Sequence, residues 1–168
     1  MLENDCVFID LDGVILNSEE RMLERKESIG LCNHYCEQEF EEYFNYTNLH
    51  PTEWDYIIRN ASSINGSVEI IKELEKIRKV AILTKIHTLY EMKVKIEDLR
   101  KIECPVIFVP PGVKKHNVVL PNGQLLIDDS ENNVSLWLEN GGNGLVFDKS
   151  ISDDTSVKVR SLEFLLKR

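Results

Sequence analysis

Long apolar runs are absent from this chain of 168 residues. No run approaches the roughly 20 apolar residues that a membrane-spanning helix needs, and residues 1–10 lack the basic and then apolar layout of a secretory signal peptide. Internal repeats, low-complexity tracts and polar linkers are missing too. We therefore expect a cytoplasmic protein with no membrane partner, folded as one unit with room for a modest insertion.

Cysteine is scarce, and its spacing requires neither a disulfide nor a metal. The chain has four cysteines, and a protein without an export signal keeps them reduced. Cys32 and Cys36, with His34 between them, are residue types that bind zinc. No second ligand pair follows at a suitable distance, so we expect these residues to pack on a helix instead.

Basic residues are outnumbered by acidic ones. The chain has 20 Lys and Arg against 29 Asp and Glu, which gives a net charge of −9. Such a surface repels nucleic-acid backbones and acidic membranes, so we expect no nucleic-acid partner, and a small phosphorylated ligand has to be attracted by a local site. The oligomeric state stays open.

Apolar residues form five short runs that are rich in Val, Ile, Leu and Phe. This composition is typical of strands buried on both faces. The runs cover residues 6–11, 80–83, 105–109, 124–128 and 144–147.

Helical patterns separate the later runs. Ser67 is a candidate N-cap after the turn pair at 65–66, and Ser130 is a candidate N-cap for a helix that stops at the glycines 141–142. Residues 87–101 place four apolar residues on one helix face: Leu89, Met92, Ile96 and Leu99. Alternating strands and helices predict right-handed crossovers and a parallel sheet with helices on both sides.

One long interval interrupts this alternation. About fifty residues between the first strand and Ser67 contain no good strand, but they show helical or mixed apolar spacing at 20–30 and 35–45. We interpret residues 18–64 as a small helical cap inserted into a core of residues 1–17 and 65–168. The cap is aromatic, with FEEYFNY at 40–46, Trp54 and Tyr56. These rings could stack on a base or could only hold the cap together.

Polar residues follow the predicted strands. They are Asp10 and Asp12 after the first, Thr84 after the second, Lys114 and Lys115 after the third, and Asp128 and Asp129 at the end of the fourth. Ligands of open parallel sheets bind beyond the carboxyl ends of the strands, so we expect these side chains to converge. Each also has an ordinary explanation as a turn, a helix cap or a solvated charge. Their order, each after its own strand, favours a site.

The paired acids indicate a metal. Side chains alternate along a strand, so Asp10 and Asp12 can point the same way, where they repel unless a cation or a shared proton lies between them. With Asp128 they suit Mg²⁺, which takes carboxylates, keeps waters and accepts a substrate phosphate. Gly13 lets the backbone turn sharply beside the ligand. A lysine and Thr84 could hold phosphoryl oxygens.

In this order the motifs resemble the haloacid dehalogenase (HAD) superfamily of aspartate-nucleophile phosphatases. They are DLDGV at 10–14, ILT at 82–84, a lysine at 114 or 115, and LIDD at 126–129. The resemblance covers nearly the whole chain. It implies an α/β, Rossmann-like three-layer fold with a five-stranded parallel sheet and a cap over the site.

The resemblance also implies a reaction. Asp10 would be the nucleophile that takes the phosphoryl group, and Asp12 would protonate the leaving oxygen and then activate water. Within the superfamily, dehalogenases lack an acid at the second position and pump ATPases carry Thr, so Asp12 indicates phosphomonoester hydrolysis.

Binding roles follow from the same resemblance. Thr84 and a lysine would hold the phosphoryl oxygens, and we favour Lys115 with Lys114 as the alternative. The segment after Gly13 would form a flap. Mg²⁺ would be held by Asp10, Asp128 and the backbone carbonyl of Asp12, with Asp129 in support.

The substrate is less defined. Residues 126–147 look like the 5'(3')-deoxyribonucleotidase branch, in which an Asp pair is followed by Asn, Trp and a Gly-Gly helix stop. This similarity favours a (deoxy)nucleoside monophosphate, with a sugar phosphate or another phosphorylated compound as the alternative. Lys85 follows Thr84 where a small or polar residue is more usual, so it could crowd or recharge the pocket mouth.

Two other classes of protein stay open. A non-catalytic relative with a regulatory or structural role is favoured if Lys85 blocks the site. A receiver-like signalling domain also has paired acids, Thr and Lys on a parallel sheet. There, however, the paired acids and the phosphorylated Asp lie on different strands, and the long insertion exceeds a usual crossover loop.

Overall fold

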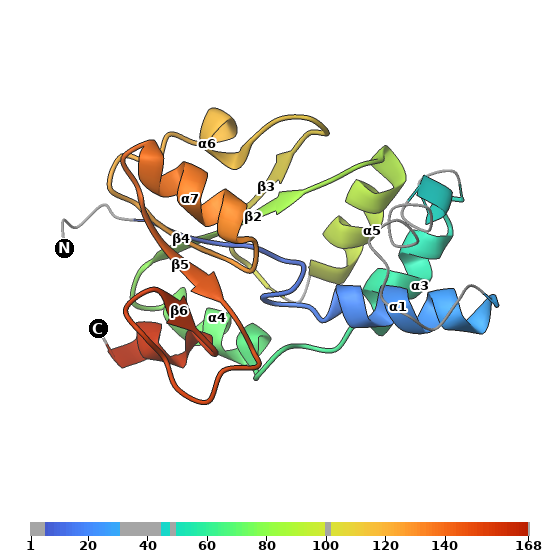
Figure 1. Cartoon of the computed structure of the whole chain (residues 1–168), viewed down its shortest axis with the longest axis horizontal. Helices are drawn as coiled ribbons and strands as arrows, with labels where there is room; N and C mark the ends of the chain where they lie inside the picture. Colours follow the sequence, from blue (N-terminus) through green and yellow to red (C-terminus); the bar gives the residue numbers. More distant parts are fainter. Residues whose placement is uncertain (1–5, 31–44, 48–49, 100–101, 168) are drawn as a thin grey trace.

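A single parallel sheet organises the chain. The computed structural model describes residues 6–30, 45–47, 50–99 and 102–167. In this part of the chain the strand order is β3-β2-β1-β4-β5-β6, and all pairs are parallel (Figure 1). The strands are β1 (Cys6–Ile9), β2 (Lys79–Lys85), β3 (Val106–Val109), β4 (Leu125–Asp128), β5 (Asn143–Phe147) and β6 (Lys158–Val159).

The predicted α/β, Rossmann-like class is confirmed, but the predicted number of strands is wrong. Each of the five apolar runs forms a strand. The sixth, β6, has two residues and forms no apolar run of its own. β6 forms because it pairs with β5. The Val146 N–H donates to the Val157 carbonyl at 2.9 Å, and the Asp148 N–H donates to the Val159 carbonyl at 2.8 Å.

Helices cover both faces of the sheet. In β1, Val7 and Ile9 point into one core cluster and Phe8 into the other, as strand alternation requires. Phe8 packs edge-on against the fully buried Trp137, with 5.5 Å between ring centroids. The core helices are α4 (Ser67–Leu74), α5 (Leu89–Asp98), α6 (Lys115–Val118), α7 (Glu131–Glu139) and the 3-10 helix η2 (Leu162–Lys167).

Of the two predicted helix caps, one is confirmed and one is wrong. Ser130 caps α7, and its side chain accepts a hydrogen bond from the Asn133 N–H. Ser67 is instead the first residue of α4, whose cap is Gly66 with φ of 69°. The Ser67 hydroxyl donates to the Ile15 carbonyl at 2.9 Å, so it fastens the helix to the chain after β1.

The predicted apolar face of α5 is also wrong. Leu89 is 78% exposed and Ile96 is exposed as well, whereas Leu99 is buried. The helix buries Glu91, Val94 and Lys95 instead. Because these two charged residues pair with each other, the side of the helix that carries them can lie inside the protein.

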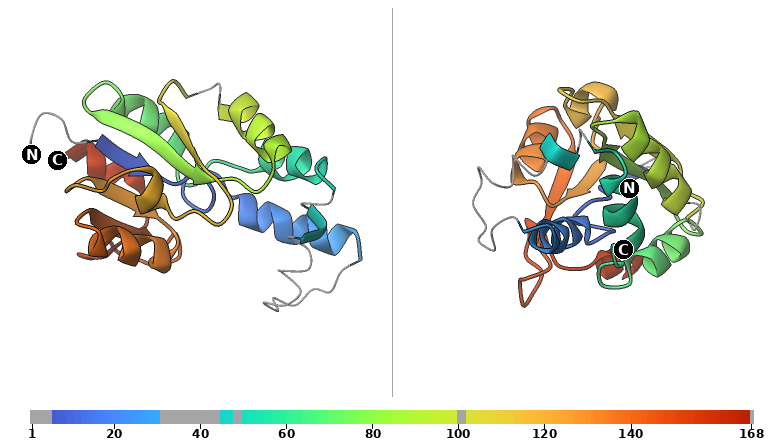
Figure 2. Two further views of the ribbon diagram at one scale, coloured as in Figure 1. Left: turned by 90° about the horizontal axis from the view of Figure 1, so that it is seen from above. Right: turned by 90° about the vertical axis from the view of Figure 1, so that its right-hand side faces the viewer.

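A cap lies between β1 and α4 in the sequence. Its described helices are α1 (Ser18–Ser28) and α3 (Glu53–Asn60), and they lie beside α5 at the end of the molecule away from the chain termini (Figures 1 and 2). The helix expected at 20–30 is confirmed by α1, and α3 was not predicted. Most of the pattern at 35–45 lies outside the described residues. The limits of the cap at 18–64 stay a prediction.

Ion pairs and backbone hydrogen bonds fix the described cap helices. The Arg25 guanidinium binds both oxygens of Glu53, at 2.7 and 3.1 Å, and so joins α1 to α3. The Tyr90 hydroxyl of α5 donates to Asp55 of α3. The two connections to the core run side by side, since the Asn17 N–H donates to the Ser62 carbonyl.

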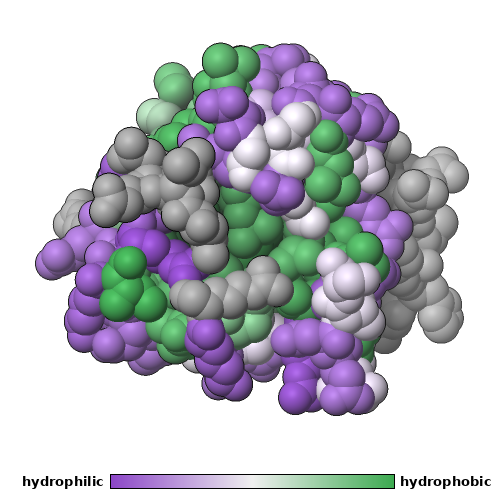
Figure 3. Space-filling model, turned by 90° about the vertical axis from the view of Figure 1, so that its left-hand side faces the viewer, coloured by the Kyte–Doolittle hydropathy of each residue, from purple (hydrophilic) through white to green (hydrophobic). Residues whose placement is uncertain are grey.

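The face opposite the cap is of mixed character. Hydrophobic side chains are visible in its middle, with hydrophilic ones around them (Figure 3). Within the described ranges, no helix combines the length and the apolar composition that a membrane span needs.

Candidate active site

Asp10 lies at the carboxyl end of β1, where the chain passes between β2 and β4. Its N–H donates to the Ile127 carbonyl of β4 at 2.9 Å. The side chain is buried, and its Oδ1 accepts hydrogen bonds from the Leu11 N–H at 2.8 Å and from Lys115 at 2.9 Å. These contacts hold the carboxylate in one orientation.

Three carboxylates meet beside this strand end. Asp10, Asp128 and Asp129 each place an oxygen within 4.8 Å of the others. Asp128 is fully buried and accepts hydrogen bonds from Asn133 Nδ2 at 3.0 and 3.1 Å. Part of Asp129 is exposed, but partial desolvation of its carboxyl group and then the charges of Asp10 and Asp128 raise its pKa to about 8. An all-oxygen set with this excess of negative charge fits a hard divalent cation such as Mg²⁺.

One of the two predicted lysines enters this cluster. Lys115, the first residue of α6, is buried, and its Nζ lies 2.9 Å from Asp10 Oδ1 and 2.6 Å from Asp128 Oδ2. Burial opposes its charge, but the two carboxylates outweigh burial and raise the pKa of Lys115. Lys114 precedes the helix and is exposed.

Gly13 turns the chain away from the site. Its φ is 75°, and its N–H donates to the Leu16 carbonyl at 2.9 Å. A Cβ at this position would lie 2.0 Å from Asp129 Oδ2, a distance that real contacts do not reach. The glycine is therefore required for close approach of the turn to the carboxylate as well as for its backbone conformation.

Replacing Gly13 by Ala is expected to disturb the carboxylate cluster. The positive φ alone costs about 1–2 kcal/mol, and the clash displaces Asp129 in addition. Gly141→Ala is the matched control, because Gly141 has φ of 83° and nothing within 4 Å of the added Cβ. Both variants should unfold at a lower urea concentration than the parent protein. Only Gly13→Ala should be stabilised less by added Mg²⁺. Equal Mg²⁺ responses would contradict the prediction.

Asp12 has other partners than Asp10. Its Oδ2 accepts a hydrogen bond from Lys95 at 2.6 Å, and its Oδ1 accepts one from the hydroxyl of Ser18, the first residue of α1, at 2.7 Å. Thr84 Oγ1 lies 3.4 Å from the same Oδ2. Burial favours the neutral acid, but Lys95 and then Ser18 outweigh burial and lower the pKa of Asp12.

Lys95 is a site residue that the sequence patterns do not reveal. It is fully buried, and its ammonium group also contacts Glu91 at 2.7 Å and the Lys85 carbonyl at 2.9 Å. Glu91 and Lys95 are four residues apart, so one helix face carries both. That spacing is equally typical of a solvated surface pair. The apolar residues of α5 also predict that a different face of the helix is buried.

A pocket of about 280 Å³ opens between the cap and the strand ends. Trp54 and His87 stack on its wall with 6.2 Å between ring centroids and an angle of 7°. Tyr56 is not part of the lining and lies under the Arg25 guanidinium instead. Residues 40–44 lie outside the described chain. The lining consists of Asp12, Gly13, Ser18, Glu19, Met22, Trp54, His87, Glu91 and Asp129.

Lys85 lies beside the carboxylate cluster. Its Nζ donates to Asn133 Oδ1 at 3.2 Å, and it is not among the residues that line the pocket. Burial and then the neighbouring Lys115 lower its pKa. Lys85 therefore recharges the surroundings of the site without crowding the pocket.

The predicted polar site residues lie in two groups at the strand ends, with one exception. Asp10, Lys115, Asp128 and Asp129 form one group, and Asp12 with Thr84 forms a second group beside it. Lys114 belongs to neither. The partners that the sequence patterns missed come from helices: Ser18, Glu91, Lys95 and Asn133.

Comparison with known proteins identifies the fold. No family model and no curated protein matches the chain. Solved structures do match: the magnesium-bound HAD hydrolase YfnB of Bacillus subtilis is 12% identical, with 98% of each chain covered and a TM-score of 0.69. A haloacid dehalogenase-like family hydrolase of Streptococcus pneumoniae is 14% identical, with 99% of each chain covered and a TM-score of 0.69. The chain has a HAD-like fold.

A third similar structure with this HAD fold contains ligands. It is a HAD family enzyme of Bacteroides thetaiotaomicron in complex with magnesium and inorganic phosphate. That enzyme is 17% identical to this chain, the comparison covers 91% of this chain and 98% of the enzyme, and the TM-score is 0.53. At these identities the similarity shows a common fold, and the chemistry of this chain has to be argued from its own residues.

Proposed function

We propose that this protein is a Mg²⁺-dependent phosphomonoester hydrolase that works through an aspartyl-phosphate. The observation that carries the proposal is the arrangement of Asp10 and Asp12. Asp10 is fixed within the carboxylate cluster by Lys115, whereas Asp12 faces the pocket between Lys95 and Ser18. Two acids with different partners at one strand end suit two different roles.

The reaction has two displacements at phosphorus. Asp10 attacks the phosphoryl group, the bond to the ester oxygen breaks, and Asp12 gives a proton to that oxygen. Despite burial, Lys95 lowers the pKa of Asp12 in the free protein, so Asp12 has to take up this proton when the anionic substrate binds. Asp12 then takes a proton from water, which attacks the aspartyl-phosphate and releases inorganic phosphate with a free Asp10. In this reaction Thr84 and Lys115 would bind the phosphoryl oxygens.

Asp10, Asp128, Asp129 and the backbone carbonyl of Asp12 would hold Mg²⁺. When bound, the ion offsets the negative charge of the phosphoryl group and of the carboxylates. Asn133 and Lys115 fix Asp128, and Gly13 leaves room for Asp129.

For the substrate we propose a (deoxy)nucleoside monophosphate, with a sugar phosphate as the alternative. The resemblance of residues 126–147 to the deoxyribonucleotidase branch supports this choice. So does the pocket wall, where the partly exposed His87 ring stacks on the buried Trp54. A cytoplasmic location is part of the proposal, since such metabolites are found there.

The other two classes are less well supported. Lys85 is held against Asn133 and does not fill the pocket, which removes the main argument for a non-catalytic relative. The strand order β3-β2-β1-β4-β5 differs from the 2-1-3-4-5 order of flavodoxin-like domains, to which receiver-like proteins belong.

Phosphate release from a panel of monoesters tests the proposal. The panel contains nucleoside monophosphates, sugar phosphates and an aryl phosphate, each with Mg²⁺ and with chelator. We expect release only with Mg²⁺, and a rise in melting temperature on adding Mg²⁺ that Asp128→Asn removes. Phosphate release that persists in chelator would contradict the metal's role. A folded protein that binds Mg²⁺ but releases no phosphate would favour the non-catalytic relative.

A further inference from the structure

The pocket beside the phosphoryl site is lined by acids. Asp12, Glu19, Glu91 and Asp129 all contribute to its wall, and none of the described lining residues is Lys or Arg. Accepting the proposed function, we infer that the organic part of the substrate carries no negative charge. The substrates are then phosphate esters of neutral or cationic alcohols, and compounds with a second phosphate or a carboxylate are rejected.

Glu19 contributes most to this selection. It is exposed in the first turn of α1, and no ion pair among the described residues involves it. Glu91 differs, because it is buried and contacts both Lys95 and the His87 N–H. The charge of Glu91 is therefore balanced within the protein, while Glu19 presents its charge to whatever fills the pocket.

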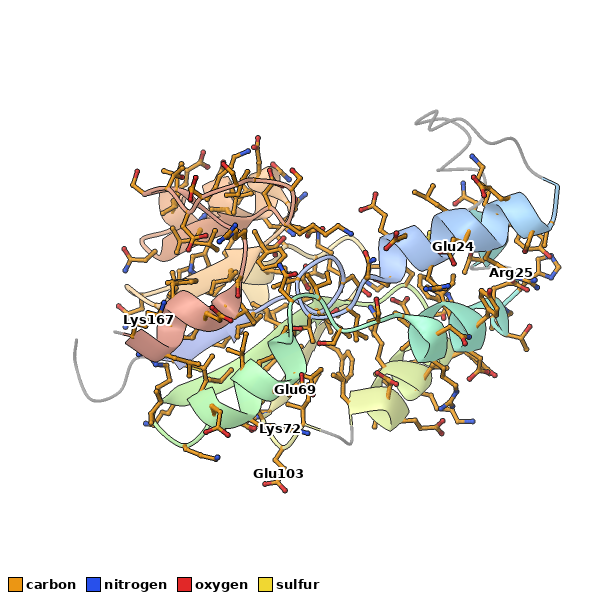
Figure 4. The ribbon with its side chains drawn as sticks, turned by 90° about the horizontal axis from the view of Figure 1, so that it is seen from below. Glu24, Arg25, Glu69, Lys72, Glu103 and Lys167 are labelled. Carbon is orange, nitrogen blue, oxygen red and sulfur yellow. The ribbon has the colours of Figure 1, made fainter. Side chains whose placement is uncertain are left out.

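Cationic side chains near the pocket are engaged elsewhere. Arg25 binds Glu53 and lies toward the outer end of α1 (Figure 4). Arg59 pairs with Asp55 and Glu97. The Lys149 ammonium group donates a hydrogen bond to the side-chain amide oxygen of Asn17. None of these lines the pocket.

The other cations of α1 do not line the pocket either, since Arg21 pairs with Glu24 and Lys26 is buried. Residues 27–58 contain neither Lys nor Arg but several Glu and Asp. This holds for the whole segment, whatever its conformation. Neither buried lysine at the strand ends is free for a second anion, since Lys95 binds Asp12 and Glu91, and Lys115 binds Asp10 and Asp128 and would serve the reacting phosphoryl group.

The remaining wall favours neutral or cationic groups. Trp54 and His87 present a stacked pair of rings, and Met22 adds an apolar side chain. Aromatic faces attract cations through their quadrupole and stack on neutral planar groups. A neutral nucleoside meets these conditions, and so does an amino alcohol.

Matched substrates that differ in one anionic group test the inference. The pairs are glycerol 3-phosphate with 3-phosphoglycerate, and glucose 6-phosphate with 6-phosphogluconate. We expect kcat/KM to be at least about tenfold higher for the neutral member of each pair, and ethanolamine phosphate to be accepted. An anionic member that is turned over as well as its neutral partner would overturn the inference.

Charge reversal at Glu19 sharpens the test. Glu19→Lys should reduce the ratio of kcat/KM between the neutral and the anionic member of each pair about tenfold. This effect should be smaller at high salt. Glu20→Lys is the matched control, because it makes the same change one residue away at a position outside the lining. It should leave this ratio unchanged. An equal effect of both variants would mean that only net charge matters and would overturn the role of Glu19.

Hydrolysis assays test the proposed reaction, and binding measurements test the charge selection separately. If no monoester is hydrolysed, including the aryl phosphate, the proposed reaction fails. Binding of the same pairs to Asp10→Asn in the presence of Mg²⁺, measured by calorimetry, then still tests the charge selection. Tighter binding of the anionic members would overturn it.

Discussion

Asp10→Asn is expected to abolish phosphate release while the protein stays folded. The amide keeps the shape of the side chain but cannot displace an ester oxygen from phosphorus. Loss of the nucleophile of a covalent mechanism lowers kcat on the order of 10⁴- to 10⁶-fold. The assay is release of inorganic phosphate from the best substrate of the panel at saturating Mg²⁺.

The fold should survive because the contacts of Asp10 can be kept. The Leu11 N–H and Lys115 donate to Oδ1, and an amide oxygen accepts the same hydrogen bonds. The substitution also removes one of three mutually repelling carboxylates. In chelator, the melting temperature of the variant should therefore equal or exceed that of the parent protein.

Two outcomes would contradict this prediction. Loss of the folded state would mean that Asp10 is needed for structure. Activity within about tenfold of the parent would mean that another group attacks phosphorus. Mass measurement after quenching in acid adds a direct test, since the parent but not the variant should carry a phosphoryl group.

Much of the fold could be predicted because its strands are locally encoded. The five apolar runs favour strands through their own composition, and each forms a strand. The exceptions depend on contacts distant in sequence. The two residues of β6 are defined by pairing with β5, and Ser67 binds the Ile15 carbonyl instead of capping its own helix. On α5, the hydrophobic spacing predicts a buried face, but Leu89 and Ile96 of that face are exposed.

The candidate site divides in the same way. The sequence alone predicts that the residues at strand ends lie close together, because parallel strands all end at one edge of the sheet. It does not predict the same of Asn133, Ser18 and Lys95, since they reach the strand ends from helices whose rotation the sequence leaves open. Each is a polar side chain with an ordinary surface explanation until the packing is known. The catalytic roles themselves stay predictions.

Lys95→Met combined with Glu91→Gln is expected to impair proton transfer by Asp12. Removing Lys95 alone would leave Glu91 as a buried unpaired charge, which costs about 3–5 kcal/mol of stability. The double variant keeps the buried pair neutral and similar in volume, so it should stay folded. Without the 2.6 Å contact from Lys95, Asp12 loses the partner that holds its Oδ2.

The size of the effect should depend on the leaving group. An alkyl phosphate needs a proton on its departing oxygen, and general acid catalysis contributes about 10²- to 10⁴-fold. An aryl phosphate has a stable leaving group that needs little help. We expect kcat/KM to fall about 10²-fold for the alkyl ester and much less for the aryl ester. Lys93→Met, at an exposed lysine of the same helix, is the control and should change neither.

A double-mutant cycle with Asp12 decides whether Lys95 acts through that residue. Asp12→Asn alone should reproduce the dependence on the leaving group, because it removes the acid itself. If Lys95 and Glu91 serve to position Asp12, their substitution should add almost nothing in the Asp12→Asn background. Independent effects that multiply would mean that Lys95 supports the fold or the phosphoryl site by another route. Equal losses for alkyl and aryl esters would lead to the same conclusion, since a general disturbance of the site does not distinguish leaving groups.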